Sequence, residues 1–155
     1  MIAYLCLGSN LADPSKQIQI AVEQIEAVQD IFILRKSGLI ETEPYGITDQ
    51  PMFFNQILEI KTSLAPDALL NRLLDIESQM GRIRDNRWGA RIIDIDILLY
   101  DDLVINSETL TLPHPDFHYR TFALKLLCKL IPDKIHPILK KSYAEMLGML
   151  EDKEN

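Results

Sequence analysis

The sequence predicts an α+β fold, because two helical patterns are set among strand-like runs. Apolar residues recur every three or four positions over residues 14–28 and over residues 66–80, and each pattern has a proline at its start. Runs of aliphatic and β-branched residues lie before, between and after these helices. The order strand, helix, strand, strand, helix, strand predicts a ferredoxin-like βαββαβ core, in which helices pack mainly on one face of an antiparallel sheet.

The strands of this core can be assigned in order. Residues 2–7 form the first, and Gly8 is expected to make the tight turn that follows it. Residues 31–42 form the second, with a bend or bulge near Ser37 and Gly38. Residues 53–62 form the third, in which alternate side chains point to opposite faces. The residues expected to share one face are Phe53, Asn55, Ile57, Glu59 and Lys61.

Extra strands and C-terminal helices are expected after the core. The fourth strand covers residues 92–100, and Asp101–Asp102 is typical of a hairpin turn leading into residues 103–105. Residues 109–112 form a short extended piece. Residues 119–131 form a helix and residues 142–150 a weaker one, and the polar tail is expected to be frayed.

Length and composition favour one globular domain over residues 1–155. Hydrophobic residues make up 47% of the chain, and no apolar run reaches the roughly 18 residues that span a bilayer. The net charge of −7 argues against nucleic acid or an anionic membrane as a partner, since both require a basic surface. The N-terminus lacks the basic region of a signal peptide, so we expect a cytoplasmic protein. We also expect a monomer.

The two cysteines are isolated from each other. Cys6 falls in the first strand and Cys128 in an apolar helical segment, a spacing that forms neither a metal site nor a disulfide framework. We therefore expect two buried free thiols.

Two aspartates stand out in the fourth strand. Alternation places Asp94 and Asp96 on one face, with Cα atoms about 7 Å apart, and the aliphatic residues on the other. The aliphatic residues are Ile93, Ile95, Ile97 and Leu99. Two carboxylates whose oxygens approach to about 4 Å repel by roughly 4 kcal/mol at an effective dielectric constant near 20. Mg²⁺ removes this repulsion, and it takes its other ligands from water and substrate phosphates.

Four arginines precede this strand. Arg82, Arg84, Arg87 and Arg91 are four of the seven arginines in the chain and fall within ten residues. Guanidinium groups bind phosphate oxygens bidentately, so arginines beside paired aspartates indicate a metal and polyphosphate site. Each half of the pattern also fits a structural interpretation, because edge strands point charges outward and surface loops carry ion pairs.

The combined string is more specific than either half. RWGARIIDIDI, residues 87–97, resembles the signature of the 6-hydroxymethyl-7,8-dihydropterin pyrophosphokinase family of the folate pathway. The resemblance implies transfer of pyrophosphate from ATP to the hydroxymethyl oxygen of the pterin, with release of AMP. It implies that Asp94 and Asp96 hold two Mg²⁺ ions and that Arg82 and Arg91 act with them in catalysis.

The resemblance extends to a pterin site between residues 42 and 55. The implied pterin-binding residues are Thr42, Pro44, Tyr45, Phe53, Asn55 and, from a later segment, Phe122. A pterin is flat, aromatic and polar at its edge, so stacking by Phe53 and hydrogen bonding by Asn55 suit it. Without the resemblance, the residues favour a structural interpretation, in which Phe53 and Phe54 lie in the core and Asn55 caps a turn.

A second stretch, residues 113–122, also resembles the family. It contributes to a set of implied nucleotide-binding residues: Glu77, Arg84, Arg87, Trp88, Ile97, Thr111, His114 and Arg120. Glu77 fits equally a solvated charge in the last turn of its helix. The chain departs from the family pattern at Ala90, where proline is usual, and at Pro115, where an aromatic is common. It also has Phe53 where tyrosine is frequent, so one hydroxyl contact is absent.

Two other functions remain open from the residues alone. A metal-dependent phosphohydrolase would use the same aspartates and arginines with water as the acceptor. An RNA-binding module would use Phe53 and Phe54 as a stacking platform, although its groove should be basic. The fold does not decide among these, because this arrangement hosts many activities.

Overall fold

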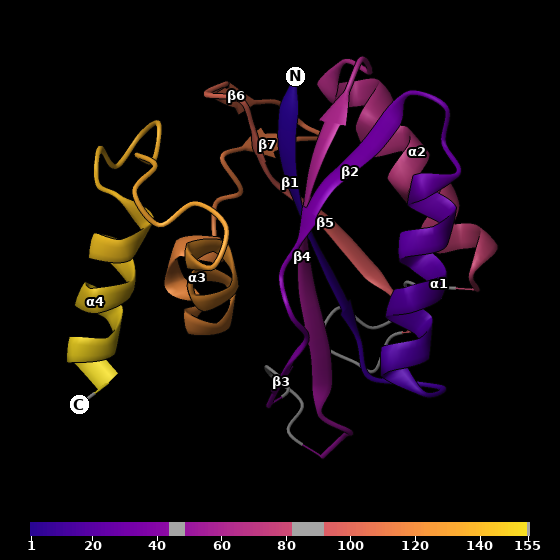
Figure 1. Ribbon diagram of the computed structural model, residues 1–155, viewed down its shortest axis with the longest axis horizontal. Helices are drawn as coiled ribbons and strands as arrows, with labels where there is room; N and C mark the ends of the chain where they lie inside the picture. Colours follow the sequence, from indigo (N-terminus) through magenta and orange to yellow (C-terminus); the bar gives the residue numbers. More distant parts are fainter. Residues whose placement is uncertain (44–48, 82–91, 155) are drawn as a thin grey trace.

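The computed structural model describes residues 1–43, 49–81 and 92–154. Strands dominate the first part of this range, with helices set among them, and helices end it (Figure 1). In chain order they are β1 (Ile2–Ser9), α1 (Pro14–Glu26), β2 (Ile31–Lys36), β3 (Ile40–Thr42), β4 (Phe53–Thr62), α2 (Pro66–Gln79), β5 (Asp94–Tyr100), β6 (Ile105–Asn106), β7 (Thr111–Leu112), the 3-10 turn η1 (Phe117–Tyr119), α3 (Thr121–Cys128) and α4 (Tyr143–Glu154).

The main sheet has the strand order β2-β4-β1-β5, and β3 pairs with β4 beside β2. Every pairing within it is antiparallel. This order confirms the predicted ferredoxin-like core, because the two helical crossovers, through α1 and α2, place β1 and β4 at the centre. The predicted bend in residues 31–42 is also confirmed, since β2 and β3 are separated at Ser37–Leu39.

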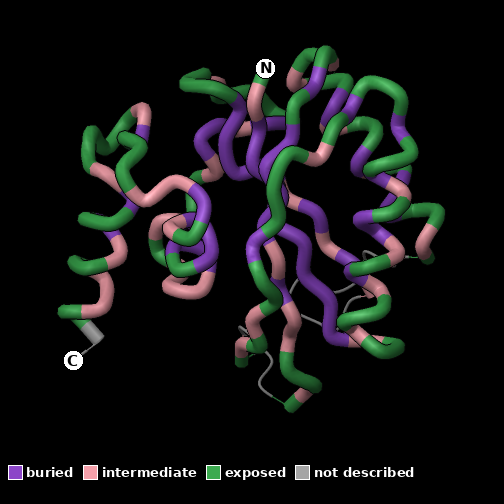
Figure 2. Tube along the Cα trace, in the orientation of Figure 1, coloured by how far each residue is buried: buried purple, intermediate pink, exposed green. Residues whose placement is uncertain are grey.

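Helices cover both faces of the sheet. Helices α1 and α2 lie against one face, and α3 lies against the other with α4 outside it (Figure 1). The buried residues form two clusters accordingly, one on each side of the central strands (Figure 2). The expectation that the core helices pack on one face is confirmed, and Leu98 and Leu99 of β5 present a second apolar surface that α3, one of the expected C-terminal helices, buries.

A β-bulge explains why Leu99 is on this second face. The register of β1 and β5 shifts between Tyr4 and Leu5, so that Leu98 has no partner in β1. Ile93, Ile95 and Ile97 face α1 and α2 as predicted, but Leu99 faces α3. The prediction that Leu99 shares the face of Ile97 is wrong, because the bulge inserts one residue into the alternation.

The segments after β5 differ from their predicted pairing and ends. Residues 105–106 pair with β7 rather than folding back on β5 as a hairpin. Helix α3 begins at Thr121, after η1, and ends at Cys128. Helix α4 continues to Glu154, so the tail is not frayed from residue 151. A capping box at its start, with Ser142 Oγ accepting from the Glu145 N–H at 3.1 Å, stabilises this helix.

Two smaller expectations concern the cysteines and membranes. Both cysteines are free, but Cys6 is buried whereas Cys128 is partly exposed, so the expectation of two buried thiols holds for Cys6 only. Among the described residues, no helix has the length and apolar character needed to cross a membrane.

Candidate active site

The two aspartates lie at one end of the sheet, on the face that α3 covers. Asp94 is paired with Gly8 and Asp96 with Cys6, and the Cys6 side chain belongs to the α3 cluster. Residues directly opposite in a sheet share a face, so both aspartates project toward the same side as Cys6. Both are half-buried. The prediction that the two carboxylates are same-face neighbours is confirmed.

Gly8 lies inside β1 and not in a turn, which corrects the expected tight-turn role. It is paired with Asn55 of β4 on one side and with Asp94 of β5 on the other. Neighbouring strands are about 4.8 Å apart, so Asn55 and Asp94 lie roughly 10 Å apart across the glycine. This row joins the predicted pterin and metal parts of the site.

Asn55 is held by a contact with β3. Its Nδ2 donates to Thr42 Oγ1 at 2.8 Å, and the residue is only 5% exposed. Thr42 is paired with Phe53 in the ladder between β3 and β4. The structure thus brings together three predicted pterin-binding residues, Thr42, Phe53 and Asn55. The turn-capping interpretation of Asn55 is wrong, because the residue lies in the interior of a strand.

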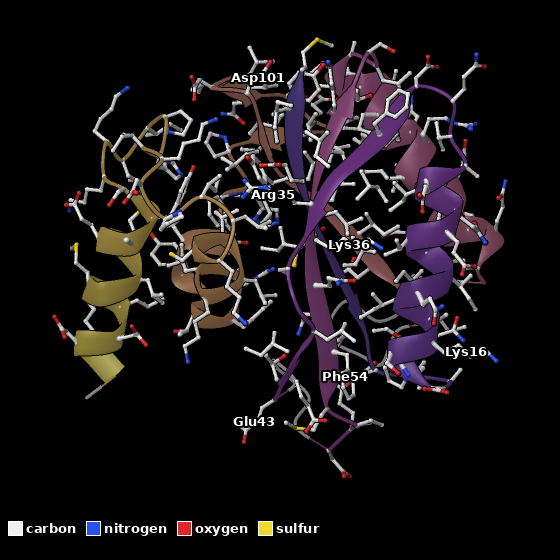
Figure 3. All side chains as sticks on the ribbon, viewed as in Figure 1. Lys16, Arg35, Lys36, Glu43, Phe54 and Asp101 are labelled. Atoms are coloured by element: carbon white, nitrogen blue, oxygen red, sulfur yellow. The ribbon has the colours of Figure 1, made fainter. Side chains whose placement is uncertain are left out.

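The two adjacent phenylalanines of β4 point to opposite faces. Phe53 shares the face of Asn55 and is half-buried, whereas Phe54 packs against the cluster beneath α1 and α2. Figure 3 shows Phe54 at the end of the sheet next to β3, and Asp101 at the opposite end. The pair therefore does not form a shared stacking platform, which removes the basis for the RNA-binding alternative. The core interpretation holds for Phe54.

His114 is attached to the strand that carries the aspartates. Its backbone N–H donates to the Leu98 carbonyl at 2.9 Å, and its Nδ1 accepts from the Asp116 N–H at 3.1 Å. Burial, followed by the positive charge of Arg120, lowers the pKa of His114 to about 4. The imidazole is therefore neutral at pH 7, and its proton lies on Nε2, where it can be donated to an anion.

Arg120 is the N-cap residue of α3, and its charge acts on the same thiol, Cys6, as the charges of both aspartates. Burial raises the pKa of the Cys6 thiol, Asp96 and Asp94 raise it further, and Arg120 opposes them. The thiol therefore stays protonated at neutral pH and is unsuited to act as a nucleophile. The charges of Arg120 and Asp94 also act on His114, so these three residues lie in one region.

Glu77 has a structural contact that the sequence did not predict. It is 1% exposed, and its Oε2 accepts from the Ile95 N–H at 2.6 Å. This bond satisfies a backbone group on the outer strand of the sheet, midway between Asp94 and Asp96. The interpretation of Glu77 as a solvated charge is wrong, because local sequence did not show that α2 packs against β5. Its nucleotide-binding role remains a prediction.

Asn10 is a further polar residue of the site region that the sequence analysis missed. It is 1% exposed, and its Nδ2 donates to Gln50 Oε1 at 2.9 Å and to the Pro51 carbonyl at 3.0 Å. These bonds tie the end of β1 to the residues that enter β4. A polar residue directly after a buried strand is the signal that could have identified it.

The remaining predicted residues fall into two groups. Thr111 is half-buried in β7, Phe122 is half-buried on α3 against the second cluster, and the Ile97 side chain is buried beneath α1 and α2. A nucleotide contact by Ile97 would therefore involve its backbone. The residues outside the described part of the chain are Pro44, Tyr45, Arg82, Arg84, Arg87, Trp88 and Arg91.

The donor set fits Mg²⁺ bound together with a substrate. Within the described ranges, no group of three or more His, Cys, Asp or Glu side chains is placed to hold a metal alone. Mg²⁺ is commonly held by one or two carboxylates plus substrate phosphates, and Asp94 and Asp96 supply two. Their half-buried position on one face suits a metal that arrives with a polyphosphate.

Known pyrophosphokinases are similar to this chain over most of its length. The chain is 40% identical over 142 residues to the 2-amino-4-hydroxy-6-hydroxymethyldihydropteridine pyrophosphokinase of Aquifex aeolicus, covering 92% of this chain and 88% of that one. It is 39% identical over 135 residues to the Haemophilus influenzae enzyme of the same name, covering 87% and 84%.

Longer proteins contain a similar unit. The chain is 43% identical over 149 residues to the folic acid synthesis protein fol1 of Schizosaccharomyces pombe, of which it covers 20%. Its fold resembles a crystal structure of Plasmodium falciparum HPPK-DHPS, wild type, with pteroate, at a TM-score of 0.79 and 18% identity. That likeness covers 98% of this chain and 42% of the other, and at this identity it concerns the fold alone.

The family model of 7,8-dihydro-6-hydroxymethylpterin-pyrophosphokinase, HPPK, matches residues 4–132, which include both stretches that carry the sequence resemblance. The chain belongs to this family of pyrophosphokinases.

Proposed function

We propose that this protein transfers the pyrophosphoryl group of ATP to the hydroxymethyl oxygen of 6-hydroxymethyl-7,8-dihydropterin and releases AMP, as a step in folate biosynthesis. The observation that carries the proposal is the row Asn55, Gly8, Asp94 across three neighbouring strands. It sets a carboxamide suited to a pterin edge about 10 Å from a carboxylate suited to Mg²⁺. Family membership supports the same reaction.

The metal and phosphate side of the site has a division of roles. Asp94 and Asp96 would hold two Mg²⁺ ions, which when bound would neutralise charge at the β-phosphorus and align the reacting groups. His114 would donate from Nε2 to the triphosphate as a neutral group, and Arg120 would bind it as a cation. Arg82 and Arg91 would add positive charge as the transition state develops. The other proposed nucleotide contacts are Glu77, Arg84, Arg87, Trp88, Ile97 and Thr111.

The pterin side of the site positions the acceptor. Phe53 and Phe122 would stack on the two faces of the ring, and Asn55 would hydrogen-bond its edge with Thr42 holding the carboxamide. Pro44 and Tyr45 would lie along the ring. The reaction forms a bond from the hydroxymethyl oxygen to the β-phosphorus and breaks the bond from that phosphorus to the oxygen that leaves on AMP. Asp96 would also orient the hydroxyl, whose proton passes to solvent water as the new bond forms.

Identification of the nucleotide product tests this reaction. We expect AMP to accumulate only when protein, Mg²⁺, ATP and the pterin alcohol are all present. Pterin-dependent ADP would contradict the pyrophosphokinase assignment, because it would indicate attack at the γ-phosphorus. Release of phosphate without pterin would support the phosphohydrolase alternative. We also infer a monomer and a cytoplasmic location, and the two free cysteines support the location.

A further inference from the structure

The position of Gly8 leaves no room for a side chain. A Cβ atom at this residue would lie 2.9 Å from Asn55 Oδ1, closer than such atoms approach in proteins, and 3.9 Å from Phe53 Cδ1. Both neighbours are predicted to contact the pterin. A side chain at Gly8 would point toward the face that carries Asp94 and Asp96, because Gly8 is directly opposite Asp94.

The backbone conformation does not require glycine here. Among the described glycines, only Gly81 has a positive φ, so Gly8 has a conformation open to any residue. A glycine inside a strand weakens the strand, because it has no side chain to pack and loses more entropy on folding. The other β1 residues between Ala3 and Ser9 are buried side chains. The property of glycine that matters at this position is therefore the absence of a side chain, which leaves space for a neighbouring residue.

The neighbour that needs this space is the Asn55 carboxamide. Asn55 is almost fully buried, and its Nδ2 is bound to Thr42 Oγ1 at 2.8 Å. A Cβ at Gly8 would displace Oδ1, and the planar amide would then turn away from Thr42 or out of the strand face. The nearest conflict is with the end of a side chain, not with backbone, so the sheet itself can keep its pairing.

We propose that Gly8 is a specificity-determining position for the pterin, because the missing side chain lets the Asn55 carboxamide lie over β1 in the orientation that reads the pterin edge. Gly8 acts through Asn55 and is a positioning residue rather than a catalytic one. The inference rests on the proposed function, in which Asn55 binds the pterin. The orientation of the Asn55 amide then depends on the absence of a side chain at Gly8 in the neighbouring strand β1.

Gly8→Ala tests the inference by calorimetry and steady-state kinetics, with Mg²⁺ and a non-hydrolysable ATP analogue present in the binding experiment. We expect the Kd and KM for the pterin to rise about tenfold, the effect of losing one well-placed hydrogen bond to a buried polar group. The affinity for the ATP analogue should be unchanged. Gly148→Ala is the matched control, since a Cβ there meets no atom within 4 Å, and it should behave as wild type.

A second pair of variants isolates the contact with Asn55. In an Asn55→Ala background Oδ1 is absent, so adding Gly8→Ala should change kcat/KM for the pterin by less than about twofold. A drop as large as in the wild-type background would overturn the inference, as would normal pterin affinity in folded Gly8→Ala. Absence of pterin binding by the wild-type protein would instead contradict the proposed function.

Discussion

The two faces of the central sheet come from the same strands but carry different kinds of residue. Beneath α1 and α2 the buried residues of β1, β4 and β5 are mostly aliphatic, as with Leu5, Leu58 and Ile95. Toward α3 the same strands present polar groups, including Asn55 and Asp94 at one end. Both faces bury apolar side chains and so stabilise the fold, but the second face also carries the polar groups of the proposed site, whose buried atoms need hydrogen-bond partners.

Polar groups on the second face are paired away from the site as well. Glu59 accepts from the Tyr4 hydroxyl at 2.5 Å and from Arg35 at 2.7 and 2.9 Å. Figure 3 shows Arg35 on the side of the sheet that faces the C-terminal helices. The Arg35 guanidinium holds the pKa of Glu59 below its usual range. A buried carboxylate is stable here because hydrogen bonds and an opposite charge replace its hydration.

The largest effect should come from the aspartates of the second face. We expect Asp94→Asn and Asp96→Asn each to lower kcat/KM by about a thousandfold, since a metal site contributes several kcal/mol to the transition state. The melting temperature should hardly change, because asparagine fits the same space. Asp102→Asn, an exposed change beyond the end of β5, is the control. Normal turnover of a folded Asp94 or Asp96 variant at ordinary Mg²⁺ would refute the metal assignment.

The aliphatic face should show the opposite result. Leu69 of α2 is fully buried, so Leu69→Ala should lower the free energy of unfolding by about 2 to 5 kcal/mol through lost contacts and a cavity. Ligand affinities of the folded variant should stay normal. Leu103→Ala, at a residue 42% exposed, should cost far less. Chemical denaturation measures both variants, and a large change in pterin or ATP affinity for Leu69→Ala would show that the two faces are not independent.

Local sequence patterns predicted the aliphatic face well. Period-two alternation in residues 53–62 and helical periodicity in α1 and α2 both follow from residues that are close in the chain. These patterns are strong because each element buries one continuous apolar stripe. The paired aspartates were found in the same way, from alternation within a single strand.

The rest of the site depends on contacts between distant residues. The bulge that moves Leu99 to the second face arises from pairing with β1, and no pattern within residues 94–100 predicts it. The bond from Ile95 to Glu77 depends on how α2 packs, and the crowding of Gly8 by Asn55 depends on strand register. Single-strand patterns carry no register information, so a glycine between two strands looked like a turn residue.

The second face should also be the more sensitive to acid. His136 is 2% exposed, burial lowers its pKa to about 4, and its Nδ1 accepts from the N–H groups of Ile138 and Leu139. The unfolded state takes up a proton below pH 6.5, whereas the folded state resists until about pH 4. The contribution of neutral His136 to the free energy of unfolding is therefore complete above pH 6.5. It is lost as the pH falls toward 4, and it amounts to at most about 3 kcal/mol.

His136→Asn tests this acid sensitivity. The asparagine Oδ1 accepts hydrogen bonds as Nδ1 does but does not titrate. Urea unfolding between pH 4 and pH 7 should therefore show a shallower loss of stability than in the wild-type protein. A residual slope is expected, because burial also lowers the pKa of His118 and of His114. An unchanged slope would mean that His136 is not neutral in the folded state.

The smallest expected effect concerns Phe122, which combines packing in the second cluster with a proposed contact to the substrate. Phe122 is half-buried on α3 and packs against the second cluster, yet it is proposed to stack on the pterin. A stacked aromatic pair contributes roughly 0.5 to 1.5 kcal/mol beyond its buried area, so Phe122→Ala should weaken pterin binding about two- to tenfold and leave ATP affinity unchanged. Calorimetry with each ligand separates the two affinities.

Phe117 provides the comparison within the same cluster. It is fully buried, and its ring packs near His136 and Tyr143, with centroids 5.8 and 6.0 Å apart. Phe117→Ala should therefore lower stability by about 3 to 5 kcal/mol without changing the pterin affinity of the folded protein. If Phe122→Ala gives that same pattern, Phe122 is a core residue. If it weakens pterin binding at a smaller cost in stability, the second face uses Phe117 for packing and Phe122 for the substrate.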